Sequence, residues 1–280
     1  MSPAPAAAFR QHPECGCSRV FEGLPGLEKT GTSVPAALTR VRANNRPDRK
    51  TDTVQHLEQD SSVRGIIIAS GLKRDIFSAG NDIQGLYAPK TTKEAYRKFW
   101  VMQNQFLARL YRSPLVTIAA IRGACPAGGC AISLCCDYRI MTEQGHIGLN
   151  EVALGISVPA KWAGLMQNTI GQGKTEQMLQ FAKLVSPQEA LQIGLIDQVV
   201  AKADLLSTAK AAMQQFLRAA PFDAGRQMTK NHLREQFSLD WEAYCVSEVD
   251  GAWEQLSQDS TVKAIAGVLE GLTKRKKSKL

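Results

Sequence analysis

A single carboxylate, Glu151, stands in an uncharged and largely apolar stretch that reads GLNEVALGI over residues 148–156. The nearest acids along the chain are Glu143 before it and Glu176 after it. Because an ionised carboxylate in apolar surroundings is costly, it is expected to be paired, hydrogen-bonded or used in chemistry. Glutamate is one of the side chains that transfer protons in catalysis, so Glu151 is a candidate general base. The alternative is an exposed or helix-capping glutamate without a chemical role.

Two loops of small residues offer a second kind of chemistry. They read FSAGND over 77–82 and GACPAGG over 123–129, and each follows an apolar stretch. Small side chains let a ligand approach the backbone closely, and ligands of open α/β sheets collect at the carboxyl ends of strands. One backbone N–H from each loop could hold one carbonyl oxygen, which is an oxyanion hole. From spacing alone, glycines that only allow tight turns explain these loops equally well.

Other chemical signatures are missing from the sequence. The seven cysteines, four of them within 125–136, do not have zinc-binding spacing, and we expect buried, reduced thiols. The four histidines are scattered, and neither a GxSxG elbow nor a GxxxxGK[ST] phosphate loop occurs. We therefore expect no metal site.

The elements that must position these residues are predicted from apolar runs. Residues 64–70, 115–121, 138–141 and 196–200 are short apolar or β-branched stretches, typical of buried parallel strands. A capping box from Thr91 to Glu94 predicts a helix to about residue 111, and CAISLCC over 130–136 predicts a second helix. Alternating strands and helices predict an α/β fold with a parallel sheet.

The two ends of the chain differ from this core. Residues 1–60 have no clear periodicity, a second capping box begins at Ser186, and the pattern beyond about 203 is helical. We expect four regions: an atypical N-terminal segment, an α/β core, a helical region and a basic tail, at residues 1–50, 51–202, 203–273 and 274–280.

Three separated motifs in this order, FSAGNDI, IRGACPAGGCAISLCCDYRI and GLNEVALGI, resemble the crotonase, or enoyl-CoA hydratase/isomerase, superfamily. Within that superfamily the chain is most similar to the Δ3,Δ2-enoyl-CoA isomerases of the mitochondrial type. The resemblance runs from about residue 52 to 235. It implies a crotonase-like ββα spiral core, a C-terminal helical trimerisation region, a homotrimer or hexamer, and an acyl-CoA thioester as substrate.

The resemblance also implies roles for particular residues. Two backbone N–H groups, matching Ala79 and Gly128, would hold the thioester carbonyl, and Glu151 would be the catalytic acid–base group. The residues expected to line the thioester, the pantetheine and the acyl group are Ala79, Gly80, Asn81, Asp82, Ile83, Gly128 and Asn150.

The residue at position 131, an alanine, favours one reaction of the superfamily over another. Hydratases of the superfamily carry one glutamate just after Gly-Gly-Cys and a second in the later motif, because water must be positioned and split. Here Gly-Gly-Cys is followed by Ala131, which leaves Glu151. The expected reaction is isomerisation of 3-enoyl-CoA to 2-trans-enoyl-CoA in fatty acid β-oxidation, with Glu151 moving a proton from C2 to C4. It requires no metal or redox cofactor.

The N-terminus departs from the superfamily pattern. Members begin with a strand pair, an N-R-P-like turn, an N-A-L-like CoA loop and a full helix, whereas here Asn45-Arg46-Pro47 only echoes the turn. The adenine and phosphate contacts of CoA are therefore in question, although Arg46, Arg49 and Lys50 could serve the phosphates. Three rival interpretations follow: another crotonase-type reaction such as hydration, an RNA-binding protein, or an inactive scaffold.

Charge and termini bear on partners and location. Five positive charges lie in the C-terminal KRKKSKL, so the rest of the chain carries +3 of the net +8. Without basic residues interleaved with aromatic ones, nucleic-acid binding is not favoured, and no apolar run is long enough to span a bilayer. Ser278-Lys279-Leu280 matches a peroxisomal import signal, so we expect the import receptor as a partner and the peroxisome as the location. The acid-poor stretch before Glu14 makes the mitochondrion the alternative.

Overall fold

The computed structural model describes residues 27–29, 36–41 and 47–277, and the side chains of 52–272 and 274. The S-K-L end, Arg46 and the side chains of Arg49 and Lys50 lie outside this part. The strands are β1 (Leu27–Lys29), β2 (Ala36–Val41), β3 (Gly65–Ser70), β4 (Val116–Ile121), β5 (Cys125–Pro126), β6 (Tyr138–Thr142), β7 (Ile147–Gly148) and β8 (Gln198–Val200).

The helices are α1 (Pro47–Gln59), α2 (Lys93–Arg112), α3 (Gly128–Leu134), α4 (Ala160–Ile170), α5 (Gln172–Gln180), α6 (Pro187–Gln192), α7 (Leu205–Ala219), α8 (Asp223–Leu256) and α9 (Asp259–Lys277). Three short 3-10 turns are η1 (Ala88–Lys90), η2 (Glu151–Leu154) and η3 (Lys202–Asp204). None of the described helices is long and apolar enough to cross a membrane.

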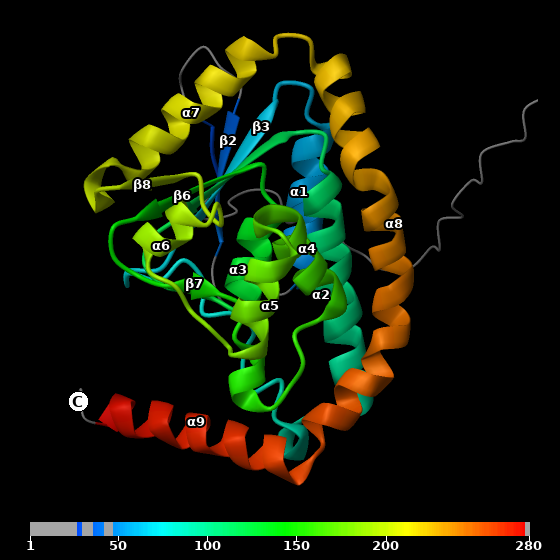
Figure 1. Cartoon of the computed structure of the whole chain (residues 1–280). Coiled ribbons are helices and arrows are strands. Elements are labelled where there is room, and N and C mark those ends of the chain that lie inside the picture. The colour runs from blue at the N-terminus through cyan, green and yellow to red at the C-terminus, as the bar shows by residue number, and fades with distance from the viewer. Residues whose placement is uncertain (1–26, 30–35, 42–46, 278–280) are drawn as a thin grey trace, which may run out of the picture.

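One large sheet carries the fold, with strand order β1-β2-β3-β4-β6-β8 (Figure 1). β1 pairs with β2 antiparallel, and all the other neighbours pair in parallel. A second sheet consists of β5 and β7, also parallel. The parallel arrangement predicted from the apolar runs is confirmed.

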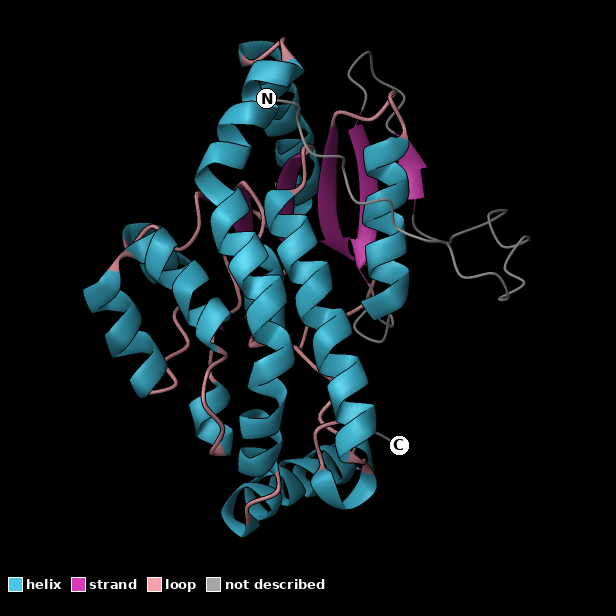
Figure 2. Cartoon of the chain, turned by 90° about the vertical axis from the view of Figure 1, so that its right-hand side faces the viewer, coloured by secondary structure: helices cyan, strands magenta, loops and turns pink. Residues whose placement is uncertain are grey.

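Both faces of the central strands β3 and β4 are buried, which explains why these two strands are almost continuously apolar. In β3, Ile66 and Ile68 face one cluster, whereas Ile67 faces a second cluster that contains Met213 of α7. This alternation follows from the two-residue period of a strand. Helices accordingly flank the strands on both sides (Figure 2).

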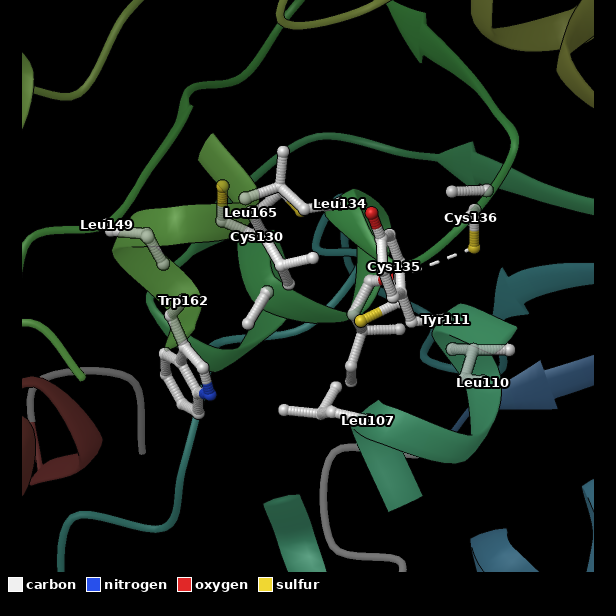
Figure 3. Packing of buried hydrophobic residues seen from close by; sticks show 14 of the residues in the cluster. Leu107, Leu110, Tyr111, Cys130, Leu134, Cys135, Cys136, Leu149, Trp162 and Leu165 are labelled. Carbon is white, nitrogen blue, oxygen red and sulfur yellow. Dashed lines mark hydrogen bonds between the residues drawn. The ribbon is translucent and has the colours of Figure 1, made fainter. Parts of the chain in front are cut away.

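The short helix α3 occupies the centre of the larger cluster. Figure 3 shows Cys130 and Leu134 of α3 among Leu107 of α2 and Trp162 and Leu165 of α4. The five described cysteines are all buried and free, as predicted. Burial raises the pKa of the Cys130 thiol far above its usual range, so this thiol stays protonated and acts as a small apolar side chain.

The long helices α2 and α8 run antiparallel to each other at the edge of this core (Figure 1). Arg112 contacts Glu242 at one end of the pair and Arg97 contacts Asp250 at the other. α9 then runs across the end of the molecule, beyond the last turn of α8. The helical region predicted beyond residue 203 is confirmed as three helices.

Two expectations about individual elements were wrong, and a third region had no element predicted. The N-cap of α2 is Thr92 rather than Thr91, because its hydroxyl accepts the N–H of Ala95 at 3.2 Å and the helix begins one residue later. α3 begins at Gly128, two residues early, since the glycines tolerate the first turn. The segment before residue 64 contains β1, β2 and α1, although its sequence shows no periodicity. β1 pairs with β2, β2 pairs with β3 and α1 packs on α2, and a local sequence pattern does not reveal such long-range contacts.

Candidate active site

A cavity of about 1150 Å³ lies where the loops after β3 and β4 meet α2, α4, α8 and α9. Its wall includes all five residues of the 79–83 stretch together with Asn150 and Glu151. The sequence-predicted residues therefore come together around one space, with the exception of Gly128. Gly128 is buried and does not line the cavity, whereas its neighbours Pro126 and Ala127 do.

The first loop is held against the second by backbone contacts. The N–H of Phe77 donates to the carbonyl of Ala124 at 2.9 Å, and Ile76 forms a parallel bridge with Ala124. Gly80 has φ +87, a conformation that side chains rarely adopt, and an added Cβ would lie 3.3 Å from the nitrogen of Gly128. A glycine is required here both for the turn and for the close approach of the two loops.

The second loop turns sharply into α3. Ala127, the N-cap of α3, has φ 52 and ψ −127, which is an unfavourable backbone conformation for a residue with a Cβ. Its N–H donates to the carbonyl of Gly148 at 2.8 Å, and its carbonyl accepts from the N–H of Ala131 at 3.0 Å. Strain of this kind persists only where the surrounding structure holds it, and it concentrates at functional sites.

The backbone N–H groups of Ala79 and Gly128 donate no hydrogen bond within the described part of the chain. They belong to two loops that are in direct contact, since a Cβ on Gly128 would lie 2.9 Å from Oδ1 of Asn81. The arrangement has the elements of an oxyanion hole, which are two backbone donors supplied by separate loops.

Glu151 begins η2 and is 7% exposed. Neither of its carboxylate oxygens has a hydrogen-bond partner within the described residues. Burial raises the pKa of Glu151 to about 7, because desolvation disfavours the charged form. A carboxyl group with a pKa near neutrality, on the wall of a cavity, is suited to take up and return a proton at physiological pH.

Ala131, which marks the position of the absent hydratase acid, lies fully buried in α3 and is not part of the cavity wall. The wall carries two further carboxylates, Asp82 and Glu248. Sequence reasoning placed Asp82 there but missed Glu248, because nothing near it in the sequence distinguishes it from other acids of α8. Glu248 accepts the indole N–H of Trp100 at 3.3 Å, and burial raises its pKa.

The cavity wall also contains aromatic residues that sequence reasoning missed. Tyr96 and Trp100 of α2 and Trp162 of α4 form a stack in which successive ring centroids are 5.7 and 5.8 Å apart. The spacing from Tyr96 to Trp100 places both rings on one face of α2, and this was the available signal. Within the described residues, no group of His, Cys, Asp and Glu is arranged to hold a metal ion.

The structure combines a helix-covered parallel sheet with two small-residue loops in contact and a buried acid, Glu151. This combination indicates the class of protein, and the sequence names it. The sequence pattern of Enoyl-CoA hydratase/isomerase matches residues 48–277, so the chain belongs to the enoyl-CoA hydratase/isomerase family. The crotonase-like fold expected from the sequence is confirmed by the same match and by the structural neighbours. A trimerisation role for the helical region remains a prediction.

Several known proteins are similar to this chain. The mouse protein Enoyl-CoA delta isomerase 1, mitochondrial, is 35% identical over 256 residues, which cover 88% of this chain and 87% of that protein. The human protein of the same name is 38% identical over 226 residues, covering 80% of this chain and 73% of that protein. A short-chain-enoyl-CoA hydratase of Clostridium acetobutylicum is 28% identical over 249 residues, covering 87% of this chain and 94% of that protein.

Among solved structures, the human mitochondrial delta3-delta2-enoyl-CoA isomerase has a TM-score of 0.79 at 35% identity, covering 87% of this chain and 96% of that one. The enoyl-CoA hydratase of Bacillus halodurans has a TM-score of 0.75 at 21% identity, covering 87% of this chain and all of that one, and it supports the fold alone. Isomerases and hydratases of the family thus share this architecture, and the site must distinguish the reactions.

Proposed function

We propose that this protein isomerises 3-enoyl-CoA to 2-trans-enoyl-CoA, with Glu151 as the acid–base group. The observation that carries the proposal is the buried carboxyl of Glu151 on the cavity wall, with no hydrogen-bond partner in the described chain and a pKa of about 7. The similarity to isomerases at 35–38% identity supports it. Fatty acid oxidation is the process that would supply such a substrate.

The proton transfer proceeds in two steps. A C2 proton between the thioester carbonyl and the C3–C4 double bond is acidified by both groups. The carboxylate of Glu151 takes this proton, and the electron pair of the C2–H bond delocalises into a dienolate. The protonated Glu151 then returns the proton to C4, which places the double bond between C2 and C3. One carboxyl suffices because the reaction has no net gain or loss of a proton.

The dienolate places negative charge on the thioester oxygen. We assign the N–H groups of Ala79 and Gly128 to stabilise that charge, because both lack a partner in the described chain and their loops touch. Removing one such donor from an enzyme typically costs about 3–4 kcal/mol of transition-state stabilisation. Gly80, Asn81, Asp82, Ile83 and Asn150 line the cavity beside these groups and are proposed to contact the substrate.

An assay of purified protein with a 3-enoyl-CoA tests the proposal, with the absorbance of the conjugated 2-enoyl thioester as the readout. We expect turnover by the wild type and a loss of about 10²–10⁴-fold in kcat for Glu151→Gln, which is the usual contribution of a general base. The matched control is Glu143→Gln, the same change at an exposed glutamate outside the cavity wall, which should keep full activity.

Hydration is the second candidate, because a relative at 28% identity is a short-chain-enoyl-CoA hydratase and the wall carries two acids besides Glu151. If the purified protein hydrates 2-enoyl-CoA efficiently and isomerises 3-enoyl-CoA only weakly, the proposed isomerase function is wrong and hydration takes its place. Filter binding to RNA at physiological salt tests the binding-protein alternative. Absence of any turnover, with intact folding, would indicate an inactive scaffold.

Cellular location and assembly remain predictions. The S-K-L end predicts the peroxisome and its import receptor, whereas the mouse, human and rat relatives are named as mitochondrial proteins and favour the mitochondrial alternative. Fractionation of untagged protein with and without residues 278–280 decides between these two. Light scattering tests the trimer or hexamer that the family resemblance implies.

A further inference from the structure

Three polar side chains of α8 and α9 form hydrogen bonds with residues 155–160, the segment of the chain that follows Glu151. Oε1 of Gln255 accepts both the backbone N–H of Ser157, at 2.9 Å, and its hydroxyl, at 3.0 Å. Oε1 of Glu248 accepts the N–H of Ala160 at 3.0 Å. We call the three side chains Glu248, Gln255 and Thr261 the clasp, since Thr261 makes the third contact, to the carbonyl of Gly155 at 3.3 Å.

The three side chains of the clasp contact the segment in a regular order. Glu248 and Gln255 are seven residues apart, which is two turns of α8 and places them on one face. Thr261 stands in the first turn of α9 and is fully buried. The order of the contacts along α8 and α9 is therefore opposite to the order of Gly155, Ser157 and Ala160 along the segment. Two separate helices thus hold a single stretch of chain.

The segment has few other hydrogen bonds to hold it. Within η2, the N–H of Gly155 donates to the carbonyl of Val152 at 3.0 Å. Beyond it, the N–H groups of 156–160 that donate within the described chain do so only to Gln255 and Glu248. Gly155 has φ +75 and an added Cβ would lie 3.2 Å from Oγ1 of Thr261, so the turn fits closely under α9.

Glu151 depends on this segment because its own carboxylate has no hydrogen-bond partner within the described residues. Its position is fixed through the backbone of η2, and the clasp holds the chain immediately beyond η2. Gln255 and Glu248 also line the same cavity as Glu151. The position of the proton-transferring group is thereby coupled to side chains more than 90 residues away in sequence.

We propose that Gln255 is a positioning residue for Glu151, acting through its two hydrogen bonds to Ser157. The expected effects on kcat and KM rest on the proposed isomerase function. The expected effect on the structure of the segment does not depend on that function. Gln255 is the best member of the clasp to test. Glu248 also binds the indole of Trp100, and Thr261 is completely buried, so changes at either position would disturb more than the segment.

The test compares Gln255→Leu with Gln255→Glu. Leucine removes the acceptor at similar size, whereas glutamate keeps an acceptor for both donors of Ser157. For Gln255→Leu we expect kcat to fall about 10- to 100-fold, since small displacements of a catalytic group have effects of that order. KM should stay near that of the wild type, and Gln255→Glu should restore most of kcat.

Gln236→Ala is the matched control. Gln236 also lies on α8 and makes one side-chain hydrogen bond, to Asp240 at 2.8 Å, but it does not contact residues 155–160. This variant should leave kcat unchanged. A rise in KM without a fall in kcat for Gln255→Leu would assign Gln255 to substrate contact and overturn the inference, as would wild-type kcat.

Hydrogen–deuterium exchange of the same variants provides a readout that needs no activity. The amides of 151–160 should exchange faster in Gln255→Leu than in the wild type, and should be unaffected in Gln236→Ala. Unchanged exchange in Gln255→Leu overturns the inference even if the enzyme is an isomerase. If the wild type lacks isomerase activity, the proposed function fails, while faster exchange still supports the clasp.

Discussion

The two halves of the cavity are built in different ways. The loop half consists of residues 77–83 and 123–129, of which residues 79–83, 126 and 127 line the cavity with mostly small side chains. The helical half, from α2, α4 and α8, presents large aromatic rings, and the indole N–H groups of Trp100 and Trp162 each donate a hydrogen bond. The wall of the first half is therefore formed largely by backbone and small side chains, and that of the second by side chains that hydrogen-bond partners orient.

Asn104 is the centre of the helical half. Its Oδ1 accepts the indole N–H of Trp162 and of Trp241, each at 3.0 Å, and its Nδ2 donates to the carbonyl of Trp100 at 2.9 Å. One fully buried amide thus ties α2, α4 and α8 together. The loop half has no comparable hub and depends on close approach of its backbones.

The two halves should therefore be sensitive to different kinds of substitution. In the loop half, an added atom is more damaging than a lost one, because the two loops are already in contact. In the helical half, a lost hydrogen bond is more damaging, because it leaves buried donors without a partner. Three substitution experiments can break or sharpen this distinction.

The largest effect is expected for Gly80→Ala in the loop half. The new Cβ would lie 3.1 Å from Cβ of Ala127 and 3.3 Å from the nitrogen of Gly128, and would push the loops apart. Displacement of one oxyanion donor should lower kcat by about 10²–10³-fold in the isomerase assay. Gly171→Ala is the control, since Gly171 has a similar φ of +79 but nothing within 4 Å of its Cβ position.

If both glycine variants lose the same activity, the cause is backbone strain rather than displacement of the loops. The distinction between the halves would then be wrong for the loop half. Circular dichroism of both variants shows whether the fold survives, so that activity is compared between folded proteins.

In the helical half, we expect Asn104→Leu to lower the free energy of unfolding by about 3 kcal/mol, because it leaves two buried indole donors unpaired. Urea denaturation measures this loss. Ser238→Ala at the same helix interface removes a single bond, from the hydroxyl to the carbonyl of Ala108, and should cost about 1 kcal/mol. Equal losses in both variants would refute the special role of Asn104.

The last prediction concerns the pH dependence of stability and tests whether Glu151 is buried as the structure shows. Its pKa is raised to about 7 in the fold from an ordinary 4.5, so the folded protein retains this proton more readily than the unfolded chain. Stability should therefore fall by about 3 kcal/mol as pH rises from 4.5 to 7, and stay at the lower level above that.

Glu151→Gln should remove this part of the pH dependence. The variant is then more stable than the wild type at pH 8, and the difference should vanish near pH 4. Urea denaturation at the two pH values checks this. An identical pH dependence in both proteins would mean that Glu151 is solvated and that its pKa is not raised by burial.

The sequence predicted the loop half better than the helical half. FSAGND and GACPAGG are short, contiguous and unusual in composition. Their role as loops that a ligand can approach closely could therefore be proposed from the local sequence. Tyr96, Trp100 and Trp162 are aromatic residues on amphipathic helices, which usually pack in a core, and nothing local assigned them to a cavity. Glu248 and Gln255 lie within a long helix whose local pattern carries no sign of their partners.

Local sequence determined several central elements and the two loops of small residues. Apolar runs, capping residues and glycines act over a few residues, so β3, β4 and the two loops could be read directly from the chain. The sequence also determined that Glu151 is alone in its segment. Tertiary structure decided what that isolation means, because the burial that desolvates Glu151 is a property of the folded chain. A pKa near 7 is a property of packing, and so is the position that we propose Gln255 sets, and no stretch of sequence contains either.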